Sequence, residues 1–119
     1  MIDADMVLET GTDVVGHING GHSALPDDQI TCLCENCKAA LEIVHNGNER
    51  AALLTLNTAR ELGKLDQIIL GTDGPASNSD MDMFAVMRQT GLTQKMLAAD
   101  PTFLAGDQIL RLATAAGAR

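Results

Sequence analysis

Aromatic residues are almost missing from this chain, which has two Phe and no Trp or Tyr among 119 residues. The core must therefore be aliphatic, which favours helices packed on a sheet, and there are no stacking surfaces for single-stranded nucleic acid. Basic residues are also scarce, with 8 Lys and Arg against 16 Asp and Glu. The resulting net charge of −8 gives no electrostatic reason to bind nucleic acid or an anionic membrane.

Long apolar runs and a disulfide framework are missing as well. No stretch approaches the roughly 18 apolar residues of a membrane span, and the N-terminus lacks the pattern of a signal peptide. The three cysteines are an odd number crowded into Cys32–Cys37, which is not the pattern of a secreted disulfide-bonded protein. We therefore expect a soluble, cytoplasmic protein that binds neither nucleic acid nor membrane.

Short apolar segments alternate with helical patterns along the chain. Asn48 is a plausible N-cap for the clearest helix and Gly63 its stop. Strand, helix, strand, helix with short connections predicts right-handed βαβ units and a parallel sheet. The expected strands are residues 13–18, 39–44 and 67–70. Three helices are expected at residues 49–62, 79–90 and 106–116. Residues 1–12 are expected to hold the tail of a further helix, and Ser23 and Pro26 to open another.

Each expected strand ends in a polar loop that contains glycine, at residues 17–22, 45–48 and 72–74. In a parallel sheet these loops share one rim, where α/β proteins bind ligands and place catalytic residues. Asp73 is there a candidate acid, base or metal ligand, although Asp also suits an Asx-turn or a helix N-cap. The pattern is typical of part of a (β/α)8 barrel, but three strands cannot close one, because about eight are needed.

Two other patterns suggest ligands. Cys32, Cys34 and Cys37 could begin a metal site, but a fourth ligand with suitable spacing is missing, so buried apolar side chains are the favoured interpretation. The glycines at 20–21 and 71–74 suggest phosphate binding, but they match neither G-x-G-x-x-G nor the P-loop.

Residues 13–21, residues 40–44 with Gly47-Asn48, and residues 71–75 resemble the last three barrel strands of the amidohydrolase superfamily. Within it, residues 13–75 are similar to the enamidase branch, which opens cyclic amides or enamides. Residues 68–118 look like the branch of methylthioadenosine and adenosylhomocysteine deaminases. The resemblance implies one partial amidohydrolase domain over residues 1–119: an α/β partial TIM barrel of three parallel βα units.

The resemblance also implies a metal-dependent hydrolase that cleaves a non-peptide C–N bond of a small-molecule substrate. Such enzymes hold one or two divalent metals, commonly zinc, that activate water at the C-terminal rim. Asp73 stands where the family has the Asp that ligates metal and moves a proton to the departing nitrogen. His17 matches the His after the sixth strand, which ligates the second metal in two-metal members and contacts water or substrate in one-metal deaminases. Four further rim residues are candidates for substrate contact: Asn19, His22, His45 and Asn48.

The family's first-strand His-x-His, its carboxylated Lys and its fifth-strand His are absent here. With His17 and Asp73 alone, a metal would have two of the three or more protein ligands that a catalytic zinc needs. We therefore expect a fragment of such an enzyme that is inactive in isolation, and that self-associates or requires a complementary chain supplying the missing strands. The alternative is a non-catalytic ligand-binding or assembly module that uses the same rim without metal.

Overall fold

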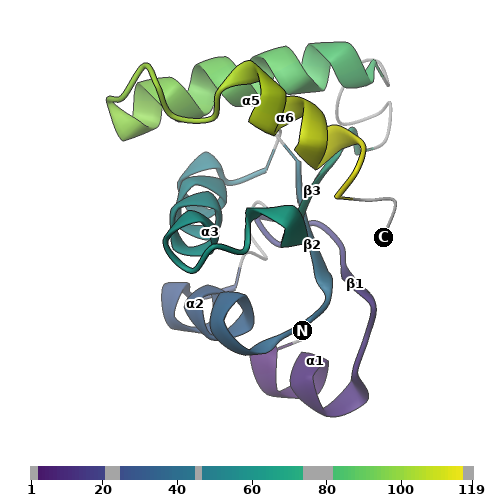
Figure 1. The fold of residues 1–119 in the computed structure, drawn as a ribbon. Coiled ribbons are helices and arrows are strands. Elements are labelled where there is room, and N and C mark those ends of the chain that lie inside the picture. The colour runs from purple at the N-terminus through teal and green to yellow at the C-terminus, as the bar shows by residue number, and fades with distance from the viewer. Residues whose placement is uncertain (1–2, 21–24, 45–46, 74–81, 117–119) are drawn as a thin grey trace.

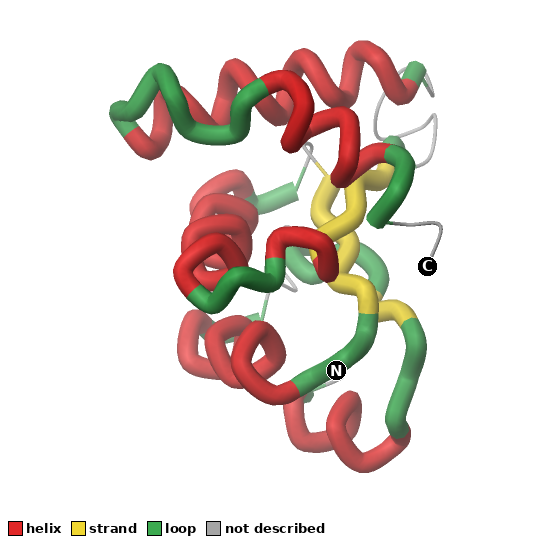
Figure 2. The backbone as a smooth tube through the Cα atoms, viewed as in Figure 1, coloured by secondary structure: helices red, strands yellow, loops and turns green. Residues whose placement is uncertain are grey.

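The computed structural model describes residues 3–20, 25–44, 47–73 and 82–116. Three short strands form a parallel sheet in the order β1-β2-β3. Helices α2 and α3 lie beside the strands, with α1 at one end and α5 and α6 at the other (Figures 1 and 2). The elements are α1 (Ala4–Thr10), β1 (Val14–Val15), α2 (Asp27–Asn36), β2 (Ala40–Val44), α3 (Glu49–Glu61), the 3-10 turn η1 (Leu65–Gln67), β3 (Ile68–Gly71), α5 (Met83–Ala98) and α6 (Gly106–Ala113). The predicted succession of three parallel βα units is confirmed.

The core lies between one face of the sheet and the helices. Leu41 of β2 is paired in register with Ile68 of β3, so both side chains project from the same face, and both are at most 1% exposed. They belong to one cluster with Ile30 and Leu33 of α2 and Leu56 of α3, which are fully buried. An aliphatic core of helices on a sheet is what the scarcity of aromatic residues predicts.

The opposite face of the sheet carries Val14, Ala40, Glu42 and Ile69, because successive side chains of a strand alternate between the two faces. None of these four residues is buried, and Val14 is 52% exposed. Val14, Ala40 and Ile69 help to line a hollow of about 1010 Å³. In a closed barrel this face would be the interior.

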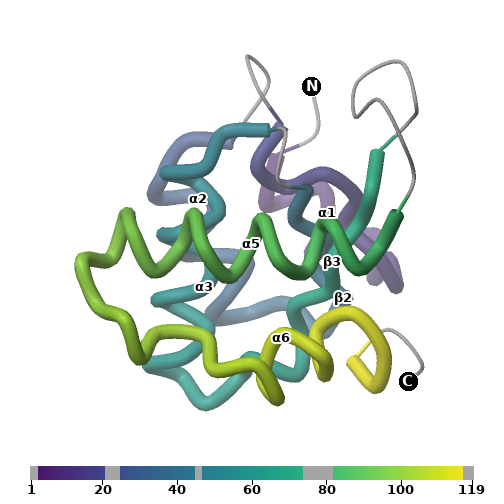
Figure 3. Tube along the Cα trace, turned by 90° about the horizontal axis from the view of Figure 1, so that it is seen from above, coloured from purple at the N-terminus to yellow at the C-terminus, as the bar shows by residue number. Residues whose placement is uncertain are grey.

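Helix α5 is longer than the sequence predicted. It begins after Asp82, whose side chain accepts hydrogen bonds from the next turn, and it continues to Ala98 rather than ending at residue 90. The predicted end was wrong, and Gly91 lies inside the helix, where a Cβ would be 2.6 Å from Cδ1 of Ile109 in α6. Figure 3 shows α5 crossing in front of α3, with α6 alongside. No helix in the described ranges has the length and hydropathy needed to cross a bilayer.

Asn19 fastens the loop after β1 to the end of β2. Its fully buried side chain donates from Nδ2 to the Val44 carbonyl at 2.7 Å and accepts at Oδ1 from the Val44 amide at 3.0 Å. The Asn19 carbonyl accepts from the amide of Asn48 at 2.6 Å. Asn48 in turn caps α3 through its side chain, as predicted. The first two rim loops are therefore one hydrogen-bonded unit.

Helices α3 and α5 meet at a buried polar contact. Gln94 is fully buried and donates from Nε2 to Glu49 Oε2 at 2.8 Å. Among the described residues, neither Glu49 Oε1 nor Gln94 Oε1 has a hydrogen-bond partner. Burial raises the pKa of Glu49, and the hydrogen bond from Gln94 offsets this only in part. The contact is thus sensitive to the protonation of Glu49.

Replacing Asn19 by Ala is expected to lower the free energy of unfolding by about 1–3 kcal/mol, because the Val44 amide loses its acceptor while the Val44 carbonyl keeps only its hydrogen bond from the Gly47 amide. Urea denaturation measures the change. Asn36→Ala, at an exposed position of α2, is the matched control and is expected to change stability by less than about 1 kcal/mol. Equal effects of the two substitutions would contradict the structural role of Asn19.

Replacing Glu49 by Gln is expected to change how stability depends on pH. Because folding raises the Glu49 pKa, the folded state binds the proton more readily, and ionisation of this group lowers the free energy of unfolding as pH rises. The stability of Glu49→Gln relative to wild type should therefore increase between about pH 4 and about pH 7. Urea denaturation across this range measures the trend, with Glu61→Gln at an exposed position of α3 as the charge-matched control. A pH-independent difference for Glu49→Gln would contradict it.

Candidate functional site

His17 and Asp73 meet at the rim of the sheet. His17 follows β1 and Asp73 follows β3, yet His17 Nε2 lies 3.6 Å from Asp73 Oδ2. Their side chains are 40% and 34% exposed, so a small molecule can reach both. The sequence predicted that residues following separate strands would meet at one rim of the sheet, and His17 and Asp73 do so.

Both residues have left-handed backbone conformations. The φ angle is 53° at His17 and 60° at Asp73. Residues other than glycine rarely adopt such angles, which cost on the order of 1–3 kcal/mol each and persist where the surroundings enforce them, often at ligand sites. The rim therefore holds the backbone of both residues in a conformation that residues other than glycine seldom adopt.

Glu42 of β2 lies between the two strands that carry the pair. Its Oε2 accepts a hydrogen bond from the His17 amide at 2.9 Å, and its carbonyl accepts from the Ile18 amide at 2.8 Å. A Cβ added at Gly71 of β3 would collide with Glu42 Oε1. Sequence reasoning missed this residue. The available signal was a carboxylate inside the otherwise apolar strand Ala40–Val44, because strands of parallel sheets are normally apolar throughout.

The His17–Asp73 pair fits part of a divalent-metal site. Imidazole nitrogen and carboxylate oxygen are both zinc ligands, and two ligands of a tetrahedral zinc lie roughly 3.4 Å apart, close to the observed 3.6 Å. The number of ligands is short, however. No group of three or more His, Cys, Asp and Glu within the described ranges is arranged to hold a metal. The pair supplies two of the at least three protein ligands that a catalytic zinc requires.

The remaining rim candidates have different positions. Asn19 is fully buried and bonded to Val44 and Asn48, so it has no surface to offer a substrate and supports the rim from beneath. The side chain of Asn48 accepts from two amides of the first turn of α3. His22 and His45 lie outside the described residues.

The three cysteines are free thiols. Among the residues that the structure describes, they belong to no group of three or more side chains that could hold an ion. Cys34 and Cys37 are 1% and 6% exposed, and burial raises the pKa of Cys34 to about 11 and also raises that of Cys37. A thiol with a raised pKa stays protonated at neutral pH and is a poor ligand. The interpretation as buried apolar side chains is confirmed for these two residues.

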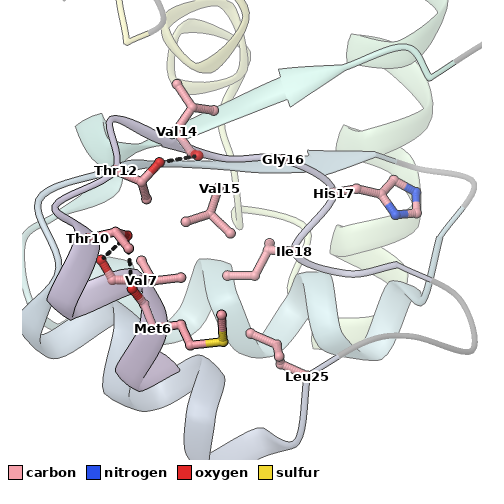
Figure 4. A pocket seen from close by; sticks show the side chains of 10 residues that line it. All are labelled: Met6, Val7, Thr10, Thr12, Val14, Val15, Gly16, His17, Ile18 and Leu25. Atoms are coloured by element: carbon pink, nitrogen blue, oxygen red, sulfur yellow. Dashed lines mark hydrogen bonds between the residues drawn. The ribbon is translucent and has the colours of Figure 1, made fainter. Parts of the chain in front are cut away.

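An apolar groove of about 610 Å³ runs between α1 and β1. Val7, Val15, Ile18 and Leu25 are turned toward it, whereas the imidazole of His17 points away (Figure 4). The groove therefore lies beside the His17–Asp73 pair rather than forming its binding pocket.

No family model matches this chain. It is similar to enamidase from Eubacterium barkeri, with 33% identity over 100 residues that cover 84% of this chain and 26% of the enamidase. It is also similar to 5'-deoxyadenosine deaminase from Methanococcoides burtonii, at 37% identity over 80% of this chain and 22% of the deaminase. A third relative is 5-methylthioadenosine/S-adenosylhomocysteine deaminase from Desulforudis audaxviator, at 39% identity over 65% of this chain and 18% of that protein.

The fold has a counterpart among solved structures. A crystal structure of enamidase, described as a new member of the amidohydrolase superfamily, superposes with a TM-score of 0.80 and 28% identity over 98% of this chain. The match covers 29% of that enamidase chain, and this protein spans about a quarter of the length of the first two curated relatives, 26% and 22%. In sequence and in fold, the chain is thus homologous to a segment of amidohydrolase-superfamily enzymes, and its sheet corresponds to part of their barrel.

Proposed function

We propose that this chain forms part of the active site of a metal-dependent amidohydrolase that cleaves a non-peptide C–N bond of a small molecule. The single observation that carries the proposal is the approach of His17 Nε2 to Asp73 Oδ2 at the C-terminal rim of a parallel sheet. This rim is where barrel enzymes place their chemistry. The similarity to enamidase and to deaminases supports the reaction class.

Each residue of the pair has a role in such a reaction. A divalent metal held at this rim, zinc by preference, supplies Lewis-acid chemistry and lowers the pKa of water to about 7. His17 and Asp73 would contribute two of its ligands. The Asp73 carboxylate is also the group that accepts a proton from water and returns it to the departing nitrogen. The His17 imidazole binds metal, or orients water or substrate beside it.

The relatives suggest the kind of substrate. Enamidase and the adenosine-type deaminases are named for small molecules whose C–N bonds they hydrolyse. We propose a cyclic amide, an enamide or an amino-substituted heterocycle for the complete site. A cytoplasmic location accords with the three free cysteines, because thiols persist in reducing compartments.

Further strands must complete the proposed site. The described residues provide two metal ligands and no strand beyond the outer edges of β1 and β3. Val14 of the edge strand β1 is 52% exposed, and the apolar groove between α1 and β1 lies beside it. Such edges and apolar faces favour association. We propose that a second copy or a complementary chain covers them, and that this chain by itself is inactive.

Zinc binding tests the proposed site. His17→Ala and Asp73→Ala should each weaken zinc affinity at least about tenfold, the equivalent of ~1.4 kcal/mol, because each removes one ligand atom. Isothermal titration of the purified chain with zinc measures the change. Cys34→Ser is the control and should leave the affinity unchanged.

Three outcomes would oppose this expectation. A wild-type chain that binds no zinc would favour a non-catalytic module on the same fold. Affinity that survives both rim substitutions would place the metal elsewhere. Loss of zinc in Cys34→Ser would assign the metal to the cysteines.

Sedimentation velocity tests the proposed association. The chain should sediment as concentration-dependent oligomers, and Val14→Glu should shift it toward monomer by placing a charge on the exposed face beside the sheet edge. Leu62→Glu, at a position 43% exposed beyond α3, is the matched control and should not alter association. A monodisperse wild-type monomer would contradict the proposal.

A further inference from the structure

We propose that Glu42 is the positioning residue of the His17–Asp73 pair: from the central strand it holds the loop after β1 in the conformation that brings the imidazole to Asp73. The inference rests on the proposed function for its significance, since that function makes the pair a site. The hydrogen bonds and close contacts that support it are independent of any metal.

Glu42 binds the loop through two successive amides. The side-chain Oε2 accepts from the His17 amide at 2.9 Å, and the main-chain carbonyl accepts from the Ile18 amide at 2.8 Å. The carbonyl bond extends the pairing of the two strands beyond Val15, where β1 ends. The carboxylate bond goes to the residue whose φ is 53°. The side chain therefore holds the left-handed turn at His17 directly.

Gly71 on the neighbouring strand β3 makes room for this carboxylate. The three nearest atoms to a Cβ built at Gly71 all belong to the Glu42 side chain, and Oε1 would be in collision. On the other side, Gly16 follows β1, and a Cβ there would lie 3.4 Å from Oε2, which is an ordinary van der Waals contact. Any larger side chain at position 71 would displace the carboxylate. The carboxylate is thus seated across the sheet, between the strands that carry His17 and Asp73.

The carboxylate has no other evident use in the fold. Among the described residues its hydrogen-bond donor is the His17 amide, and neither of the ion pairs includes it. Glu42 lies on the face of the sheet that points away from α2 and α3, and every other residue of β2 is apolar. An apolar residue would suit a purely structural role there, whereas a charged acceptor suits the amide of a strained residue.

Four variants separate this role from general stability. Glu42→Ala removes the acceptor, and Glu42→Gln keeps a side-chain oxygen in its place. Gly71→Ala displaces the carboxylate without altering it. Gly106→Ala, where an added Cβ meets nothing within 4 Å, is the matched glycine control. Hydrogen exchange of the His17 amide, followed by NMR, measures the hydrogen bond itself.

The expected pattern is specific to positioning. The His17 amide should exchange about tenfold faster in Glu42→Ala and Gly71→Ala than in wild type, which corresponds to a lost hydrogen bond. Glu42→Gln and Gly106→Ala should stay close to wild type. Equal exchange in wild type and Glu42→Ala, or exchange in Glu42→Gln as fast as in Glu42→Ala, would overturn the proposal. If Glu42→Ala does not fold, Gly71→Ala against Gly106→Ala decides in its place.

Titration with zinc alone distinguishes this inference from the proposed function. Weaker zinc binding in Glu42→Ala and Gly71→Ala, with retention in Glu42→Gln, supports both. The exchange pattern without zinc binding in any variant supports the role of Glu42 and contradicts the metal site. Zinc binding that is unchanged in Glu42→Ala, despite faster exchange, would show that the turn does not position the pair and would overturn the inference.

Discussion

The hydrogen bonds from β2 to the loop after β1 are the constraint on which the rim depends. Glu42 accepts hydrogen bonds from the amides of His17 and Ile18, and Val44, two residues further along β2 and buried, exchanges two hydrogen bonds with Asn19. A hydrogen bond to a charged group contributes about 1.5–3 kcal/mol. That is comparable with the ~1–3 kcal/mol that a left-handed non-glycine residue costs. The hydrogen bond from the His17 amide to the Glu42 carboxylate can therefore offset the free-energy cost of the left-handed backbone at His17.

Close backbone approach is the second condition at this rim. Glycine is required at position 47, where a Cβ would collide with the Asn19 carbonyl, and at position 71, where it would collide with Glu42. The absence of a side chain at these two positions allows the ends of the three strands to approach one another closely. The two faces of the sheet consequently differ: one is sealed by aliphatic side chains against α2 and α3, and the other carries a carboxylate beneath the paired His17 and Asp73.

The course of the chain could be predicted where local signals agree. Asn48 with the apolar spacing of residues 49–62 specifies α3, and the β-branched run before Gly71 specifies β3. Local signals failed where a residue serves a distant contact. The helix expected to end at residue 90 continues to Ala98, and Gly91 within it leaves space for Ile109 of α6. Asn19 suggests a polar surface residue, but the loop around it folds inward and buries it against Val44.

The sequence by itself determined the alternation of strands and helices, the parallel order of the sheet and the choice of His17 and Asp73 as rim residues. Apolar periodicity, glycine loops and family motifs are all local properties of the chain. Only the tertiary structure decided that His17 Nε2 and Asp73 Oδ2 come within 3.6 Å, and that Glu42 sits between their strands. The physical reason is that strand register and glycine-sized gaps on neighbouring strands fix which side chains meet, and neither can be read from one segment.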